Sequence, residues 1–240
     1  MIINKQQHKK IMLDILSDIS SDPLLSNNLG FKGGTCVYFL YGLDRFSVDL
    51  DFDLLDIEKK VQVLEKIDLI LGKYGEVKKD GTLRRKLKYS EESVMLKVDI
   101  SDRKEINTLN KYEVRDIVSG VPLKILSQAD IFAHKLVAIT DRYNNKTTNK
   151  IITNRDLYDV NFFFDNKWTF NEKIIALRTG ETAVEYLVDL KKLIEDRVDD
   201  KKILDGIGAL VDDKKRLWVR RNLKQEVLKK LAIQIESMRE

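Results

Sequence analysis

The 240-residue sequence has few of the residues on which disulfide-linked proteins and many metalloenzymes depend. Its single cysteine, Cys36, excludes an internal disulfide framework and a cysteine-rich zinc site, as is typical of proteins from a reducing compartment. Two histidines, His8 and His134, are too few for a catalytic metal held by histidine ligands. No apolar run approaches the length of a membrane span, and the first residues lack a signal-peptide pattern. We therefore expect a soluble cytoplasmic protein without a membrane partner.

The composition is that of a chain that folds around an apolar core. Hydrophobic residues make up 43% of the sequence and charged residues 34%, which argues against intrinsic disorder. The net charge of +4 permits a polyanionic partner but does not argue for one, because acids and bases alternate along most of the chain.

The periodicity of apolar residues changes along the chain and divides it into two parts. Helices are predicted where apolar residues recur every three to four positions, and strands where they alternate. The first part contains helices at 5–19, 35–41 and 57–72, with Thr35 as the N-cap of the second. It also contains strands at 29–32 and 48–55, three strands within 76–101, and further strand at 112–118 and 121–126. Almost everything beyond residue 127 is predicted to be helical. The sequence thus predicts an α/β domain over residues 1–125 and a helical domain over residues 126–240.

Three acids alternate with apolar residues along one predicted strand. Asp49, Asp51 and Asp53 lie two residues apart and therefore share one face of that strand. Carboxylates placed so closely repel each other, and binding of divalent cations such as Mg²⁺ relieves the repulsion. Two such ions can stabilise the attacking and leaving oxygens of a displacement at phosphorus. The alternative is an edge strand with an acidic, solvated outer face.

Two glycines precede a short apolar helix just before the acidic strand. Gly33 and Gly34, followed by Thr35, lie where a strand turns into a helix. Main-chain N–H groups and the positive end of the helix can receive a triphosphate at such a turn. Glycine pairs are common in turns, but a Gly-Gly-Thr turn followed by an acidic strand is a much narrower pattern.

Together these motifs resemble the signature of the nucleotidyltransferase superfamily that includes DNA polymerase β. The resemblance is closest to its AbiEii/MenT branch, the toxins of type IV toxin–antitoxin systems. The matching residues are Gly33-Gly34-Thr35, Arg45-Phe46-Ser47 and Asp49-Leu50-Asp51-Phe52. The resemblance implies an α+β fold, with a mixed sheet and flanking helices followed by a helical domain that completes the active-site cleft. It also implies that Asp49 and Asp51 are metal ligands, and that Asp53 is an outer acid, either solvated or behind the ligands.

The superfamily has a third carboxylate on a neighbouring strand. Asp99 fits, because Leu96, Val98 and Ile100 form an apolar face while Asp99 points to the other side. By resemblance, Asp99 is the third metal ligand and can accept the proton of the attacking hydroxyl. Asp102 is the alternative, although it lies beyond the apolar alternation.

The helical part continues the resemblance. AbiEii-type families carry a lysine and, seven residues later, an arginine, followed by an Arg-Asp-x-x-Asp motif; here these are Lys135, Arg142, Arg155, Asp156 and Asp159. Seven residues are about two helical turns, so the two cations share one stripe of the helix. The resemblance implies catalytic roles for Lys135 and Asp156. The two acids either orient the cations or touch the nucleotide, and an ordinary salt-bridged helix pair is the simpler alternative.

The resemblance implies a Mg²⁺-dependent transfer of NMP from an NTP to an RNA acceptor. Two ions are expected, with Mn²⁺ as a possible substitute. In several family members the acceptor is the 3′ end of tRNA, whose modification blocks aminoacylation, and a cognate antitoxin regulates the toxin. The residues expected to bind the nucleotide are Gly33, Gly34, Thr35, Arg45, Ser47, Lys135, Arg142 and Asp159. Two alternatives stay open: transfer to a protein or small-molecule hydroxyl, and a nucleotide- or RNA-binding regulator with little turnover.

Two basic segments and two single residues have less specific interpretations. The segment 213–230 surrounds Trp218 with lysines and arginines, and reads either as an RNA-facing helix or as a solvated helix with the tryptophan in the core. Arg84, Arg85, Lys86 and Lys88 either meet a phosphate backbone or form an exposed charged strand. Cys36 is expected to be a small buried residue, and His134 to be structural or at the surface.

Overall fold

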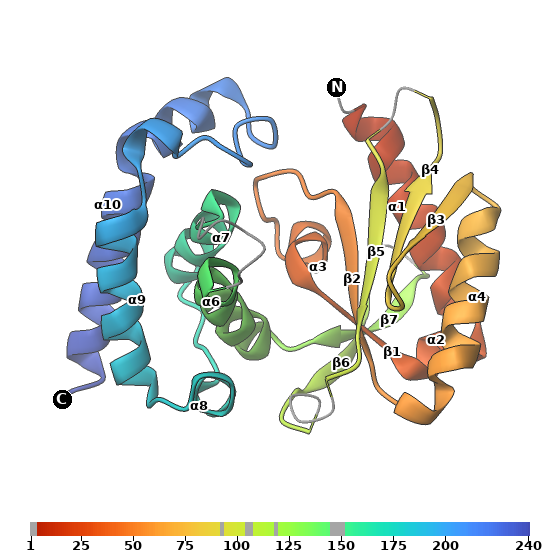
Figure 1. Cartoon of the computed structure of the whole chain (residues 1–240), viewed down its shortest axis with the longest axis horizontal. Coiled ribbons are helices and arrows are strands. Elements are labelled where there is room, and N and C mark those ends of the chain that lie inside the picture. Colours follow the sequence, from red (N-terminus) through yellow and green to blue (C-terminus); the bar gives the residue numbers. More distant parts are fainter. Residues whose placement is uncertain (1–3, 92–93, 104–107, 118–119, 145–151) are drawn as a thin grey trace. The chain divides into compact units, whose positions relative to one another are not determined.

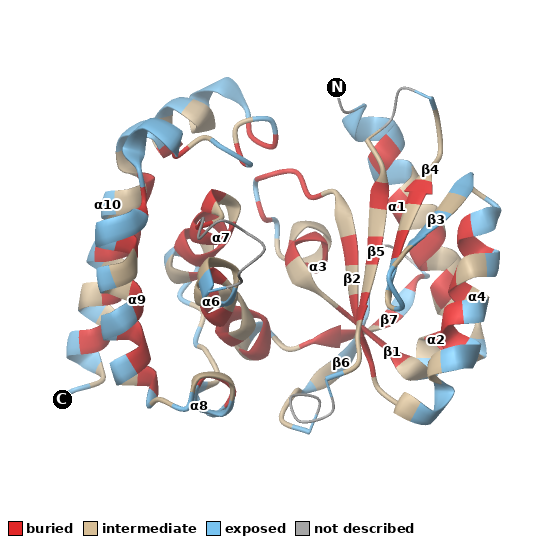
Figure 2. Cartoon of the chain, in the orientation of Figure 1, coloured by how far each residue is buried: buried red, intermediate tan, exposed pale blue. Residues whose placement is uncertain are grey.

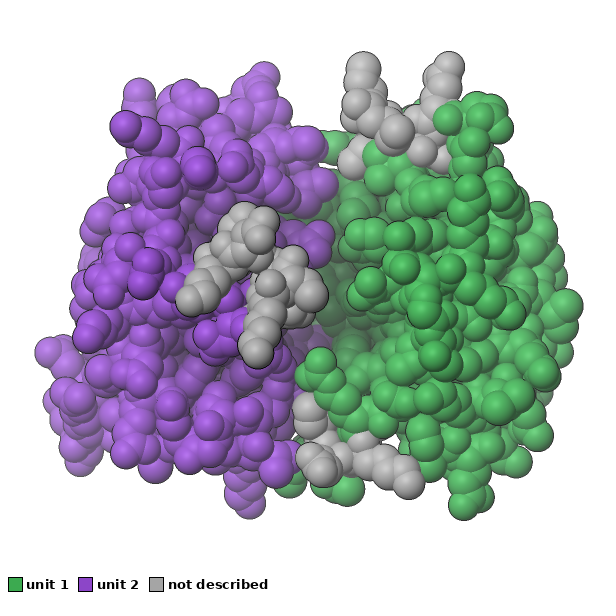
Figure 3. Space-filling model, viewed as in Figure 1, with its two compact units in different colours: residues 1–127 green, residues 128–240 purple. Residues whose placement is uncertain are grey.

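The computed structural model describes residues 4–91, 94–103, 108–117, 120–144 and 152–240. The chain divides into two compact units, Met1–Ser127 and Gln128–Glu240, which Figure 3 shows in different colours. None of the described helices combines the length and the apolar character that a membrane span requires.

The described part of the first unit contains a mixed sheet of seven strands in the order β3-β4-β5-β2-β1-β7-β6. β2 pairs parallel with β5 and antiparallel with β1, while β3, β4 and β5 form an antiparallel ladder. The strand bounds are β1 Leu29–Lys32, β2 Asp49–Leu54, β3 Glu76–Asp80, β4 Arg84–Lys88, β5 Leu96–Ser101, β6 Tyr112–Asp116 and β7 Pro122–Leu126.

In the described part of this unit, several helices cover one face of the sheet, and a single short helix packs on the opposite face (Figure 1). Figure 1 shows α1, α2 and α4 on one side of the strands and α3 on the opposite side. Leu50 and Phe52 are fully buried within the core of this unit, and the Phe52 ring lies 5.2 Å from that of Phe31. The helix bounds are α1 Lys5–Ser21, α2 Pro23–Asn28, α3 Gly33–Leu40 and α4 Lys60–Gly72, with a short 3₁₀ turn, η1, at Ile57–Lys59.

The start of α3 differs from the sequence prediction. The prediction that Thr35 is the N-cap is wrong, because the helix begins at Gly33 and Lys32 occupies the cap position. Gly33 has φ +79°, a left-handed conformation that is open mainly to glycine and lets β1 turn directly into the helix. The Thr35 side chain therefore lies inside the first turn, where its hydroxyl is available for contacts with another segment.

The described part of the second unit is helical, apart from its connecting segments. The packing of α6 against α7 includes an edge-on contact of Phe132 with Phe163, with ring centroids 5.1 Å apart. Thr182 and Glu185 form a reciprocal capping box at the start of α9. The bounds are α6 Gln128–Asn144, α7 Asn154–Asp165, α8 Glu172–Thr179, α9 Ala183–Arg197, η2 Asp200–Lys202 and α10 Asp213–Ser237. The mixed sheet with flanking helices, followed by this helical region, confirms the predicted α+β fold class.

Candidate active site

The acids of β2 and β5 lie on one face of the sheet, called here the carboxylate face (Asp49, Asp51 and Asp99). Asp51 is in register with Asp99 across the parallel pair of strands, and Asp49 is in register with Lys97. Residues in register project to the same side of a sheet, and their Cβ atoms lie about 4.5–5.5 Å apart. In Figure 2 the strands alternate between buried and half-buried residues, with these acids at half-buried positions. The sheet thus brings the three predicted carboxylates together on two neighbouring strands.

The glycine turn packs directly against Asp51. A Cβ atom added to Gly33 would lie 3.0 Å from Asp51 Cβ and Cγ, and closer still to Oδ2. A Cβ atom on Gly34 would lie 2.7 Å from Arg45 Nη2 and 3.2 Å from Ser47 Oγ. Glycine at Gly33 therefore suits both the backbone conformation and the close approach of Asp51, whereas a side chain at Gly34 would require the buried Arg45 guanidinium to shift.

Three predicted nucleotide-binding side chains are buried behind this turn. Thr35 is fully buried, and Arg45 and Ser47 are only 3% and 7% exposed. The Thr35 hydroxyl lies 2.8 Å from Ser47 Oγ and also hydrogen-bonds the main-chain carbonyl of Asp49. Arg45 Nη1 donates to the carbonyl of Phe46 at 3.1 Å. These side chains brace α3 against the start of β2 and thereby hold Asp49 in place.

Asp99 is paired with an arginine of the next strand. Its carboxylate accepts a hydrogen bond from Arg84 Nε, and this contact raises the pKa of the Arg84 guanidinium. Among the described residues, no group of three or more His, Cys, Asp or Glu side chains is arranged to hold a metal. Carboxylate oxygens suit a hard cation such as Mg²⁺, and a cation bound at Asp99 would displace Arg84 from it. That exchange costs little, because the half-exposed Arg84 side chain forms an ion pair of only about 0–1 kcal/mol.

The two remaining acids near this face are engaged elsewhere. The Asp53 side chain is 3% exposed, pairs with Lys32 and accepts a hydrogen bond from the Tyr112 hydroxyl at 2.9 Å. Of the two expected environments of Asp53, solvated or behind the ligands, this burial excludes the first; in this position Asp53 ties β1 and β6 to β2. Asp102 pairs with Lys60 at 2.7 Å, and this contact lowers the pKa of its carboxyl. Asp102 also lies beyond β5, whose register with β2 ends at Ser101, whereas Asp99 lies within that register.

In the second unit, α6 and α7 bring together the ion-pair cluster Lys135, Arg142, Asp156 and Asp159. Lys135 Nζ lies 2.9 Å from Asp156 Oδ1 and 3.0 Å from Asp159 Oδ2. Arg142 Nε lies 3.0 Å from Asp156 Oδ2. Both acids are fully buried, whereas the Lys135 and Arg142 side chains are 13% and 41% exposed. The buried acids orient both cations, as they would in a nucleotide site or in an ordinary salt-bridged helix pair.

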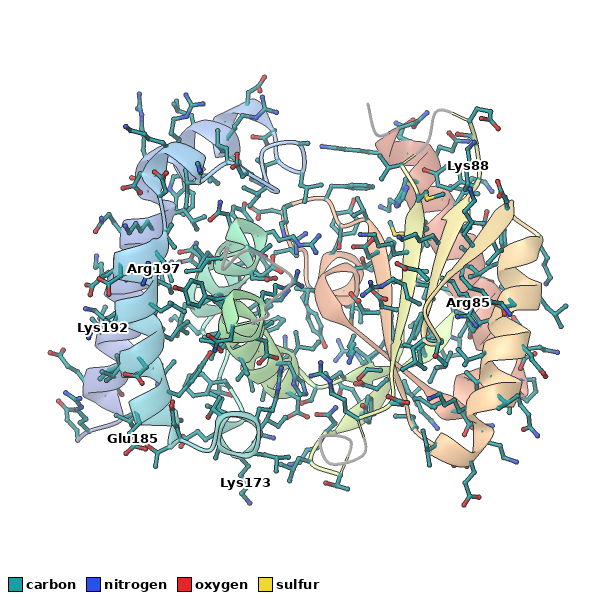
Figure 4. All side chains as sticks on the ribbon, viewed as in Figure 1. Arg85, Lys88, Lys173, Glu185, Lys192 and Arg197 are labelled. Carbon is teal, nitrogen blue, oxygen red and sulfur yellow. The ribbon has the colours of Figure 1, made fainter. Side chains whose placement is uncertain are left out.

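Other predicted residues have plainly structural positions. Cys36 is fully buried, as expected, and burial raises the pKa of its thiol. His134 Nδ1 lies 3.0 Å from Arg178 Nη1. Arg85 does not belong to a basic surface: its side chain is buried against α4, where it pairs with Asp68 (Figure 4). The reason is strand alternation, which turns Arg85 toward the helix-covered face.

Sequence reasoning assigned no role to two residues next to the carboxylate face. Lys97 is the register partner of Asp49, and the alternation of β5 that identified Asp99 already placed it on this face. His8 of α1 is fully buried, and its Nε2 lies 2.9 Å from the carbonyl of Val48, just before Asp49. No local pattern indicates this contact of His8, because it joins residues 40 positions apart.

Comparisons with known proteins give a family match and similar folds. A family model described as "Nucleotidyl transferase AbiEii toxin, Type IV TA system" matches residues 14–234. JHP933 from Helicobacter pylori has a similar fold, with 22% identity, a TM-score of 0.50, and coverage of 100% of this chain and 98% of that chain. MenT4, a nucleotidyltransferase toxin from Mycobacterium tuberculosis, is similar at 18% identity and a TM-score of 0.50, covering 93% of this chain and 91% of that chain. No curated protein matches the sequence.

Proposed function

The chain belongs to the AbiEii family of nucleotidyltransferase toxins of type IV toxin–antitoxin systems, and from this premise we propose that it transfers NMP from an NTP to an RNA acceptor. The leading acceptor is the 3′ end of tRNA. The observation that carries the proposal is the register of Asp51 with Asp99, on neighbouring parallel strands, with Gly33 packed against Asp51. A phosphate-binding turn beside paired carboxylates supports transfer at phosphorus better than it supports binding alone.

The carboxylate face would hold the metal ions of this reaction. Asp49, Asp51 and Asp99 are the ligands that we propose for Mg²⁺, with two ions and with Mn²⁺ as a substitute. When bound, the metal supplies positive charge at the phosphoryl oxygens. Asp99, once released from Arg84, is the carboxylate that accepts the proton of the attacking hydroxyl. The hydroxyl oxygen bonds to the α-phosphorus, and the bond to the pyrophosphate leaving group breaks.

The nucleotide would be bound by main-chain and cationic groups. The N–H groups at Gly33 and Gly34, where α3 begins, are the proposed contacts of the phosphates. Arg45, Thr35 and Ser47 hold this turn and the start of β2 in position. For the second unit, we assign to Lys135 and Arg142 the binding of negative charge on the nucleotide. Their orientation by buried Asp156 and Asp159 supports this assignment, because such acids fix the direction of a flexible cation.

This activity has consequences for growth and for partners. A nucleotide added to the 3′ end of tRNA removes the hydroxyl that receives the amino acid, so translation stops. We propose that a cognate antitoxin restrains the toxin and that the protein acts in the cytoplasm, where tRNA is charged.

The decisive experiment follows label from NTP into RNA. Purified protein is incubated with Mg²⁺, total tRNA and each α-labelled NTP in turn, alongside the variants Asp51→Asn and Asp56→Asn. We expect labelled tRNA with the wild type and with Asp56→Asn, since Asp56 only caps η1 and Asn caps equally well. Label should be absent with Asp51→Asn. Labelling that is unchanged in Asp51→Asn would refute the assigned site.

The same experiment tests the two other functions. If label enters protein or a small-molecule fraction and this labelling depends on Asp51, the acceptor is a hydroxyl of a protein or small molecule and not of RNA. NTP binding without label in any fraction would instead indicate a regulator with little turnover.

A further inference from the structure

A row of three lysines runs outward from the carboxylate face. Lys97 of β5 is in register with Asp49 on one side and with Lys86 of β4 on the other. Lys86 is in register with Lys78 of the edge strand β3. Residues in register share a face, so the lysine row (Lys97, Lys86 and Lys78) begins beside Asp49 and ends at the edge of the sheet.

The row is weakly neutralised within the protein. Lys97 forms no ion pair or side-chain hydrogen bond with any residue that the structure describes. Lys86 lies 2.8 Å from Asp80, and Lys78 lies 3.5 Å from Glu76. These two pairs are at least one-third exposed, and exposed pairs typically contribute only about 0.2–1 kcal/mol. A ligand carrying several negative charges can therefore displace both acids at little cost.

The lysines of the row are not used to build the core. Their neighbours on the same strands, Lys79 and Arg85, point to the other face and pair with Asp68 of α4. The row occupies the face opposite to α4. Three basic side chains lie together on this face and contribute little to stability. This arrangement indicates a surface that binds an anion.

The order of the strands separates this row from the proposed triphosphate site. The glycine turn follows β1, which borders β2 on one side, whereas the row extends across β5, β4 and β3 on the other side. Neighbouring strands lie about 4.8 Å apart, so the row spans roughly 10 Å. A nucleic-acid strand carries one phosphate per about 3.4 Å of helix axis, so the row matches roughly three phosphates.

We propose that the lysine row binds the phosphate backbone of the acceptor RNA strand, close to the end that reacts at Asp49 and Asp51. The inference rests on the proposed function and adds to it the surface that holds the acceptor. In this arrangement the acceptor enters from the β3 edge, and the nucleotide lies on the side of the glycine turn. Lys97, the register partner of Asp49, is the residue of the row nearest to the reacting end.

The test measures RNA binding without any chemical step. A fluorescent single-stranded RNA oligonucleotide is titrated with the full-length protein in the absence of NTP, over a range of salt concentrations. The variants are Lys78→Ala/Lys86→Ala/Lys97→Ala and, as the matched control, Lys79→Ala, an exposed lysine of the same edge strand on the opposite face. NTP binding and the midpoint of urea unfolding are measured for each variant.

The expected result is quantitative. Each lost phosphate contact reduces the slope of log affinity against log salt by about 0.7, so the triple variant should lose about 2. With the affinities of the two proteins taken as equal at 1 M salt, this difference in slope makes the triple variant bind RNA about 100-fold more weakly than the wild type at 0.1 M salt. Lys79→Ala should bind as the wild type does, and NTP binding should be unchanged in all variants.

Three results would overturn the inference: no RNA binding by the wild type, equal losses in the triple variant and in Lys79→Ala, or weakened NTP binding with RNA binding intact. The last would assign the row to the nucleotide. RNA binding that depends on the row, in a protein that labels no RNA with any NTP, would support the row while refuting RNA as the acceptor. Failure of the inference and failure of the proposed function are therefore distinguishable.

Discussion

The contact between Gly33 and Asp51 gives the sharpest prediction, because an alanine there has two separable effects. The first is conformational: Gly33 has φ +79°, and a residue with a Cβ atom pays about 1–2 kcal/mol in this region. The second is steric: the new Cβ atom lies 3.0 Å from Asp51 Cβ and Cγ and still closer to Oδ2. Forcing an extra methyl group into such a contact costs about 1–3 kcal/mol. Gly33→Ala should therefore lower the free energy of unfolding by about 2–5 kcal/mol.

Gly42→Ala is the matched control for this substitution. Gly42 has φ +70°, close to that of Gly33, but apart from Gly42 and its two chain neighbours no described residue has an atom within 4 Å of the position of its added Cβ. Its variant should lose only the conformational contribution of about 1–2 kcal/mol. The difference between the two variants, about 1–3 kcal/mol, measures the contact with Asp51.

The same pair of variants separates stability from activity. Displacement of a catalytic group by about 1 Å costs on the order of 100-fold in rate, so Gly33→Ala should label tRNA about 100-fold more slowly. Gly42→Ala should retain the wild-type rate under conditions in which both variants are folded. Urea unfolding gives the stability and initial rates of label transfer give the activity. Equal losses in both quantities for the two variants would refute the reasoning.

Three further predictions concern the buried charges and the metal. Asp156→Asn should lower the free energy of unfolding by about 1–3 kcal/mol in urea titrations, because it leaves Lys135 buried with one carboxylate instead of two. His8→Gln should reduce the loss of stability below about pH 6.5, measured as the thermal midpoint over a pH series. Burial lowers the pKa of His8 in the folded protein. As the pH falls below about 6.5, the pKa of histidine in the unfolded chain, the unfolded chain binds a proton that the folded chain does not, and the folded state loses stability. EDTA should abolish label transfer, and Mg²⁺ at ten times its dissociation constant should stabilise the wild type, but not Asp51→Asn, by about 1.4 kcal/mol.

Each of these predictions has an outcome that contradicts it. Stability unchanged in Asp156→Asn would mean that Lys135 does not depend on the second carboxylate, and Asp165→Asn, at an exposed acid of the same helix, is the control. If the pH dependence of the thermal midpoint is unaltered in His8→Gln, groups other than His8 cause the loss of stability at low pH. An equal thermal shift with Mg²⁺ in the wild type and in Asp51→Asn would place the bound metal away from the carboxylate face.

The sequence alone was sufficient for those features that depend on neighbours along the chain. Alternation of polar and apolar residues predicted β2 and β5, and it assigned their acids to one face because side chains of a strand point alternately to its two sides. The resemblance at Gly33–Phe52 predicted the family, which the match over residues 14–234 confirms. Cys36 could be predicted as buried because it lies within an apolar helix.

Local patterns failed where a residue's partner lies far away in the sequence. Arg85 read as part of a basic surface, but its partner Asp68 belongs to a helix on the opposite face. Asp53 read as one more acid of the alternation, although contacts from β1 and β6 bury it. Thr35 has the chemistry of an N-cap, yet the left-handed conformation of Gly33 starts the helix earlier and directs the hydroxyl to Asp49.

The sequence by itself therefore determined most of the elements, the face on which β2 and β5 carry their acids, and the family. Only the tertiary structure decided that Asp51 is in register with Asp99, that Arg84 pairs with Asp99, and that Lys97 begins a row of lysines beside Asp49. The physical reason is that strand register depends on hydrogen bonds and side-chain packing between segments far apart in the chain, and a shift by one residue would turn every side chain to the other face.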